Sequence, residues 1–142
     1  MIIGDYHNHT DFSADCDTPA ELMIEKAIDL GLSYLCMTDH MDPDMQIPGL
    51  DFTFDLDEYF AKHQEWKNRY QDKITLLTGI ELGLQPHIGE DLRNIVNAGT
   101  YDFIIGSIHV VDHVDPYFKE YWEGKTEYQG TYRYFENVLE SL

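Results

Sequence analysis

Apolar runs typical of buried strands alternate with helical patterns along this chain, and this order constrains its fold more than any other feature. The strand-like runs span residues 2–10, 33–40, 74–82 and 102–110. Each is followed by a segment whose apolar residues recur at helical spacing, over residues 18–31, 55–72, 88–99 and 126–142. Four strand-then-helix units in series predict an α/β fold with a parallel sheet and right-handed crossovers, either a barrel or an open sheet.

Three of the expected helices begin at residues that are typical N-caps. Thr18 precedes Pro19, which suits a first helical position. Asp55 pairs with Glu58 in the spacing of a capping box, and Thr126 is expected to cap the last helix. No linker or low-complexity segment interrupts the series, so we expect a single domain.

The charge of the chain restricts its partners. The sequence has 142 residues and a formal net charge of -18, with 27 acidic residues against 9 Lys and Arg. Such an acidic protein is repelled by a nucleic-acid backbone and by an anionic membrane surface. It has neither an apolar segment of membrane-spanning length nor a secretion signal, so we expect a cytoplasmic protein without nucleic-acid or membrane partners.

Two histidines close the first apolar run. In an extended strand, residues two apart point to the same side, so the imidazoles of His7 and His9 could converge on one metal ion. The pattern is weak on its own, because strand ends often carry histidines that bind no metal.

Polar side chains follow the other apolar runs as well, and together they make a stronger case. The residues expected at or near the carboxyl ends of the four strands are His7, His9, His40, Glu81 and His109. Parallel α/β barrels carry their active sites at that face. Five such groups gathered without a cation would be costly to desolvate, so the joint pattern favours a metal site. Asp15, in the loop after the first strand, is a sixth candidate ligand, although a turn aspartate is the alternative.

Imidazole and carboxylate ligands together suit Zn, Fe or Mn, and the sequence does not choose among them. A shared carboxylate such as Glu81 can bridge two ions about 3.5 to 4 Å apart, an arrangement suited to the hydrolysis of phosphate esters. The other histidines are not expected to bind metal. His63 lies on a helical apolar stripe and is expected in the core, and His87 follows Pro86 in a loop. His113 is expected either in solvent or near the rim of the site.

These motifs resemble the polymerase and histidinol phosphatase (PHP) superfamily. The matching pieces, in the order of the family, are His7-Asn8-His9-Thr10 with Ser13 and Asp15, Thr38-Asp39-His40, Gly79-Ile80-Glu81 and Gly106-Ser107-Ile108-His109. Residues 107–112, 115–117 and 121–125 are most similar to the monofunctional histidinol-phosphate phosphatases of histidine biosynthesis.

The resemblance implies a distorted seven-stranded (β/α) barrel of TIM-like type that holds two to three divalent ions. The implied ligand sets are His7, His9 and Glu81 for one ion, Glu81 and His109 for a second, and Asp15 and His40 for a third. The implied reaction is hydrolysis of L-histidinol phosphate to L-histidinol and phosphate, by a metal-bound hydroxide held by Glu81 and His109. Asp42 and Tyr117 lie where such proteins contact this small-molecule phosphate monoester.

Members of this family are considerably longer than 142 residues, and their later strands supply further ligands. We therefore expect residues 1–142 to form the N-terminal part of a truncated PHP domain, about four βα units or half of the barrel. An open half barrel exposes apolar sheet surface, which the missing half or a second copy of the chain would cover.

Three hypotheses remain open from the sequence. The first is a phosphomonoesterase that is complete only when the missing half is supplied. The second is a non-catalytic half barrel that binds metal and forms a homo-oligomer through its open sheet. The third is another PHP-type phosphoesterase, which the acidic charge disfavours where the substrate is a nucleotide or a DNA end.

Overall fold

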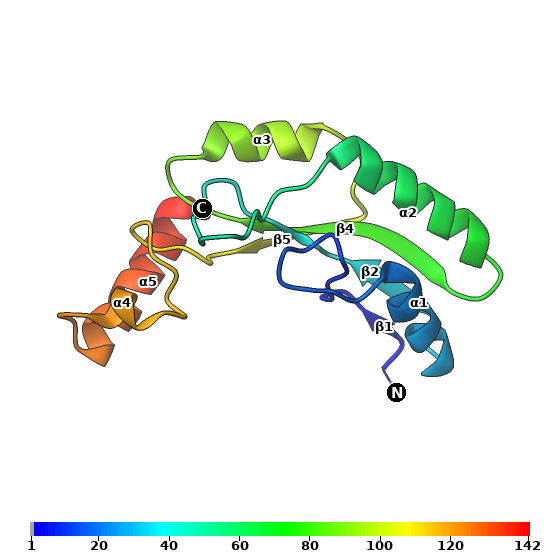
Figure 1. Ribbon diagram of the computed structural model, residues 1–142, viewed down its shortest axis with the longest axis horizontal. Coiled ribbons are helices and arrows are strands. Elements are labelled where there is room, and N and C mark those ends of the chain that lie inside the picture. The colour runs from blue at the N-terminus through cyan, green and yellow to red at the C-terminus, as the bar shows by residue number, and fades with distance from the viewer. Residues whose placement is uncertain (1) are drawn as a thin grey trace.

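Five parallel strands form one curved sheet, with α1, α2 and α3 along its convex side (Figure 1). The computed structural model describes residues 2–142. The strands are β1 (Gly4–Asp5), β2 (Tyr34–Met37), β3 (His40–Met41), β4 (Thr75–Gly83) and β5 (Phe103–Ser107). The helices are α1 (Ala20–Asp29), α2 (Leu56–Tyr70), α3 (Gly89–Asn97), α4 (Lys119–Trp122) and α5 (Glu127–Ser141). The α/β class and the parallel sheet agree with the sequence-based prediction.

The long strand β4 organises the sheet. β2 and β3 pair one after the other with β4, β1 pairs with β2, and β5 pairs with residues 79–83 of β4. Because Glu81 is in register with His40 of β3 and Ile105 of β5, it lies between two neighbouring strands. The central position of Glu81 therefore follows from the strand pairing.

The two faces of the sheet have different roles, as strand periodicity requires. On β4, Leu76, Ile80 and Leu82 point to the helices and are buried. Glu81 alternates with them and points to the concave face, and its register partner His40 lies on the same face. The helix side of the sheet thus holds the hydrophobic core, whereas the concave side carries the polar candidate ligands Glu81 and His40.

The core joins the first two helices to the sheet. Ile24 of α1, Met37 of β2 and Trp66 of α2 belong to one buried cluster. The expected stripe on α2 is buried at Tyr59, His63, Trp66 and Tyr70. His63 is only 1% exposed, which confirms that it is a core residue.

Two of the three predicted N-caps are confirmed. The Asp55 side chain accepts a hydrogen bond from the Glu58 amide, and Thr126 forms a capping box with Gln129. The prediction for Thr18 is wrong, because Pro19 is the N-cap of α1 and no side chain caps this helix.

Two predicted strands end earlier than expected, and a third is interrupted. The first is limited to β1, so His7 and His9 lie beyond it, and His109 lies beyond the end of β5 at Ser107. The run 33–40 is divided into β2 and β3 because Asp39 turns its buried carboxylate to the loop that follows His9 and accepts hydrogen bonds from Thr10 and Ser13. The short helix α4 was not expected.

Apolar side chains remain exposed on both ends of the sheet. Tyr34 and Phe103 are each 40% exposed, and α5 exposes Tyr128, Phe135 and Leu139 by 64 to 76%. Helix α5 lies at the end of the sheet opposite β1 (Figure 1). This open apolar surface agrees with the expected half barrel. Among residues 2–142, no helix has both the length and the apolar character needed to cross a bilayer.

Candidate metal centre

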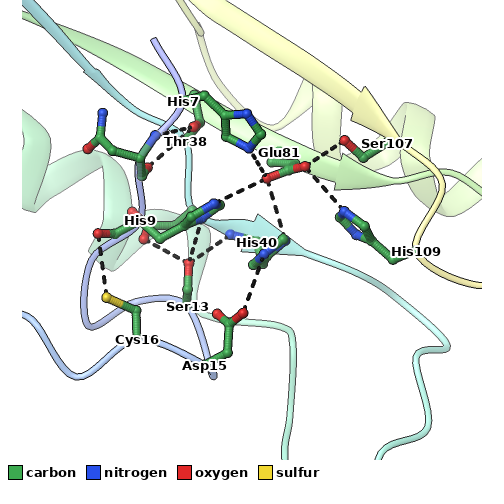
Figure 2. A network of polar contacts seen from close by, with 12 residues as sticks. His7, His9, Ser13, Asp15, Cys16, Thr38, His40, Glu81, Ser107 and His109 are labelled. Carbon is green, nitrogen blue, oxygen red and sulfur yellow. Dashed lines mark hydrogen bonds and ion pairs between the residues drawn. The ribbon is translucent and has the colours of Figure 1, made fainter. Parts of the chain in front are cut away.

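The carboxylate of Glu81 is the centre of a cluster of imidazoles on the concave face (Figure 2). Its Oε2 lies 2.9 Å from His7 Nε2 and 3.5 Å from His9 Nε2. Its Oε1 accepts a hydrogen bond from Ser107 Oγ at 2.5 Å and lies 3.2 Å from His109 Nε2. Glu81 itself is 2% exposed. A carboxylate buried in this way needs nearby cationic groups or hydrogen-bond donors, and the imidazoles and the Ser107 hydroxyl around Glu81 can all donate hydrogen bonds to it.

His40 joins the remaining candidates to this cluster. Its Nδ1 lies 3.7 Å from Glu81 Oε2 and 3.4 Å from Asp42 Oδ2, and its Nε2 lies 3.7 Å from Asp15 Oδ2. The rings of His9 and His40 stack with centroids 4.3 Å apart. The structure thus brings together all six side chains that the sequence singled out as ligands, which come from four separate segments (Figure 2).

The loop after β1 carries His7 and His9 into the site although it is not a strand. Asp39 accepts hydrogen bonds from the Thr10 amide at 2.5 Å and from Ser13 Oγ at 2.9 Å. Ser13 Oγ also accepts a hydrogen bond from the His40 amide at 3.0 Å. These buried contacts hold the His9 loop against the end of β2. The sequence motif contained Thr10, Ser13 and Asp39, but spacing alone gave them no structural role.

The cluster strongly favours positive charge beside its carboxylates. Burial alone would raise the pKa of Glu81, but hydrogen bonds from His109, Ser107 and His7 hold it well below its usual range. Burial would likewise lower the pKa of His109, yet Asp42 and Glu81 raise it to about 10. The two carboxylates thus favour positive charge at this position, which a metal ion could supply.

The residues present fit divalent metal ions. Within the described part of the chain, the buried atoms His40 Nδ1 and Asp42 Oδ2 have no hydrogen-bond partner. Two groups each bring three candidate ligand atoms within 4.8 Å of one another: His7, His9 and Glu81, and His40, Asp42 and His109. Imidazole and carboxylate donors of this kind suit Zn, Fe or Mn. The first group is a set that the resemblance implied. The second group matches none of the implied sets, because it joins His40 to His109 and includes Asp42 in place of Glu81 and Asp15.

The two candidate substrate residues lie in different surroundings. Asp42 is 3% exposed, and its Oδ1 lies 2.7 Å from His109 Nδ1, so it supports this ring from behind. Tyr117 is 86% exposed. Its side chain borders a cavity of about 510 Å³, whose other walls include His40, His109 and Phe52. The substrate-binding roles of Asp42 and Tyr117 both stay predictions.

Known proteins are similar to this chain in sequence. The chain is 32% identical to the histidinol-phosphatase of Lactococcus lactis subsp. lactis (strain IL1403), over 80% of this chain and 41% of the relative. It is 31% identical to the probable histidinol-phosphatase of Clostridium acetobutylicum, over 99% of this chain and 52% of the relative. The chain thus spans about half the length of the curated relatives it matches.

A solved structure extends the comparison to the fold. The crystal structure of the histidinol phosphate phosphatase of Lactococcus lactis, complexed with Zn, L-histidinol and phosphate, superimposes with a TM-score of 0.89 at 30% identity. The match covers 96% of this chain and 52% of that one, which confirms an α/β fold corresponding to about half of such a phosphatase. The PHP domain family matches residues 5–142. The chain therefore belongs to the PHP domain family.

Proposed function

We propose that this chain provides the metal-binding half of a phosphomonoesterase that hydrolyses L-histidinol phosphate to L-histidinol and phosphate. The observation that carries this proposal is the position of Glu81, a buried carboxylate with four imidazoles within 3.7 Å of its two oxygens. The matching Lactococcus structure supports the same chemistry, because it contains Zn together with L-histidinol and phosphate.

Two to three divalent ions, Zn, Fe or Mn, would be held by the six clustered residues His7, His9, Asp15, His40, Glu81 and His109. When bound, such ions polarise a phosphoryl group and lower the pKa of water to near neutrality. Their charge would also offset part of the net charge of -18, which otherwise repels an anionic substrate.

The protein groups around the cluster have complementary tasks. Asp42 fixes the orientation of His109 through its 2.7 Å contact with Nδ1, so that Nε2 faces Glu81. The neighbouring cavity has apolar walls at Phe52 and Tyr117, next to the polar edge formed by His40. A substrate with a phosphate at one end and a flat imidazole at the other would fit this division, with its phosphate at the polar edge.

Full activity would require residues beyond those of this chain. The chain spans about half of its relatives, and exposed apolar side chains such as Tyr34 and Phe103 leave surface that a further barrel half would cover. An incompletely enclosed site holds its ions and its nucleophile less firmly. We therefore expect the 142-residue chain to bind metal but to be a poor catalyst.

Metal analysis combined with a phosphatase assay tests both parts of the proposal. The 142-residue chain should retain at least two Zn²⁺ per chain and turn over histidinol phosphate slowly. A version extended at its carboxyl end by the second half of the Clostridium relative should be much faster. Glu81→Gln should release the ions of the Glu81 cluster and abolish activity in both versions, whereas the exposed loop variant Asp51→Asn should change neither.

The outcomes separate the metal proposal from the half-barrel proposal. A chain that retains no metal would overturn the metal centre. Normal phosphatase rates from the 142-residue chain alone would show that the second half is unnecessary. Equal activity of Glu81→Gln and the unchanged chain would exclude the cluster as the active site.

The exposed apolar surface supports a second candidate function. A non-catalytic half barrel could bind metal and pair with another copy of itself through the open sheet, where Tyr34 and Phe103 are each 40% exposed. Two measurements distinguish this candidate. It requires the 142-residue chain to form a stable dimer in analytical ultracentrifugation, and it requires the version extended at its carboxyl end to show no phosphatase activity.

A further inference from the structure

We infer that Asp44, His87 and His113 form a second divalent-metal site, separate from the Glu81 cluster. Asp44 Oδ2 lies 2.7 Å from His87 Nε2, and the rings of His87 and His113 have centroids 5.2 Å apart. One ligand atom from each of the three residues lies within 4.8 Å of the others. This set shares no residue with the clusters around Glu81 and His109.

The three residues come from three different loops at one edge of the sheet. Asp44 follows β3, His87 follows β4, and His113 follows β5. Two of these loops also carry residues of the first centre, since Asp44 is two residues from Asp42 and His113 is four residues from His109. An ion at this position would therefore join the loop after β4 to the two loops that carry Asp42 and His109.

Hydrogen bonds position Asp44 and connect the loops that carry Asp44 and His87. Gln46 Nε2 donates a hydrogen bond to Asp44 Oδ1 at 3.1 Å, which leaves Oδ2 facing His87. Gln85 Nε2 donates to the Pro43 carbonyl at 3.2 Å and so connects the loops after β3 and β4.

His113 is presented by a tight turn. The backbones of Val111 and Val114 form an antiparallel bridge, with His113 between them. Both His113, at φ 66°, and Asp44, at φ 67°, adopt the left-handed conformation, which is uncommon for residues other than glycine. The turns that carry these two donors are thus specifically shaped, and a bound ion would add to the contacts that keep them so.

The chemistry of the donors selects the kind of ion. Two imidazoles with one carboxylate suit Zn²⁺ and other late transition metals, whereas Mg²⁺ and Ca²⁺ prefer oxygen ligands. All three residues are exposed, so water would fill the remaining coordination position. Such a site would hold its ion reversibly and stabilise the three loops when zinc is present.

A simple ion pair between His87 and Asp44 is the alternative explanation, and His113 distinguishes the two. An ion pair needs only Asp44 and a protonated His87, whereas the metal site also needs His113. Loss of metal on substitution of His113 is therefore the decisive result.

Zinc binding to the full 142-residue chain tests this inference. The bound Zn²⁺ per chain is measured by equilibrium dialysis and elemental analysis for the unchanged chain, His87→Gln, His113→Gln and the control Asp51→Asn. Each histidine variant should bind one ion fewer than the unchanged chain, and Asp51→Asn should bind the same number. Circular dichroism confirms that the variants are folded, which their exposed positions favour.

The zinc stoichiometry of the variants distinguishes the site at Asp44, His87 and His113 from the Glu81 cluster. Binding of the same number of ions by His113→Gln and the unchanged chain would overturn the inference. Glu81→Gln provides the reciprocal measurement, because it should lose ions from the first centre and still retain one. Complete loss of zinc from a folded Glu81→Gln chain would also overturn the second site, whereas loss from the histidine variants alone leaves the proposed phosphatase function unaffected.

Discussion

Asp42 and Glu81 hold opposite sides of the same imidazole. Asp42 Oδ1 lies 2.7 Å from His109 Nδ1, and Glu81 Oε1 lies 3.2 Å from Nε2 of that ring. Asp42 is buried, and burial alone would raise its pKa, but the hydrogen bond with His109 and the nearby imidazole of His40 lower it. A carboxylate behind a histidine sets which ring nitrogen is free to bind a metal, and raises the basicity of that nitrogen.

The first prediction follows from this contact. Asp42→Asn should weaken metal retention about 10- to 100-fold, because an amide cannot support the ring as a carboxylate does. Competition with a zinc-binding chromophore measures the change, with Asp51→Asn as the control. A loss confined to KM for histidinol phosphate in the extended protein, with metal affinity unchanged, would instead favour the predicted contact of Asp42 with substrate.

Substitution of His9 tests the metal centre at the second oxygen of Glu81, Oε2. His9 Nε2 lies 3.5 Å from Glu81 Oε2, and its ring stacks on His40. His9→Ala should lower the metal content of the 142-residue chain and abolish phosphatase activity in the extended protein. Unchanged metal content and activity would remove His9 from the site.

Buried His63 should make the stability of the fold depend on pH. Desolvation lowers the pKa of His63 to about 3 from an ordinary 6.5, so the folded protein keeps it neutral while the unfolded chain protonates it below pH 6.5. Its contribution is complete above pH 6.5 and is lost progressively as the pH falls towards 3. Between pH 7 and pH 5.5 the free energy of unfolding should fall by about 1 kcal/mol from this residue.

The variant His63→Phe isolates this contribution. Other histidines titrate in both proteins, so the relevant quantity is the difference between the two pH dependences, measured by urea denaturation of the metal-free chain. The unchanged chain should lose about 1 kcal/mol more than His63→Phe between pH 7 and pH 5.5. Parallel pH dependences would contradict the neutral, buried imidazole.

Gly79 is required by close packing between β4 and β2. A Cβ at this position would lie 2.6 Å from Cys36 Sγ and 2.8 Å from the Met37 carbonyl oxygen, and a backbone oxygen cannot move aside. Gly79→Ala should therefore lower the free energy of unfolding by about 1–3 kcal/mol. Gly89→Ala is the matched control, since its Cβ would meet only Arg93 at 3.9 Å, and it should leave the stability unchanged or higher.

The sequence by itself indicated the order of most helices and strands and the polar residues near the ends of the strands. Apolar periodicity predicted the parallel α/β arrangement, and the caps at Asp55 and Thr126 were read from a few neighbouring residues. Local patterns succeed here because backbone preferences and side-chain periodicity act over short distances. The convergence of His40, Glu81 and His109 was likewise expected, since the carboxyl ends of parallel strands share one edge.

Only the tertiary structure decided how the loops at that edge are placed. His7 and His9 reach Glu81 from a loop rather than a strand, because hydrogen bonds from Thr10 and Ser13 to Asp39 hold that loop in position. The position of Asp42 behind His109, and the approach of His87 to His113, join segments that are far apart in sequence. Such contacts depend on the whole packed fold, and no local pattern in the chain specifies them.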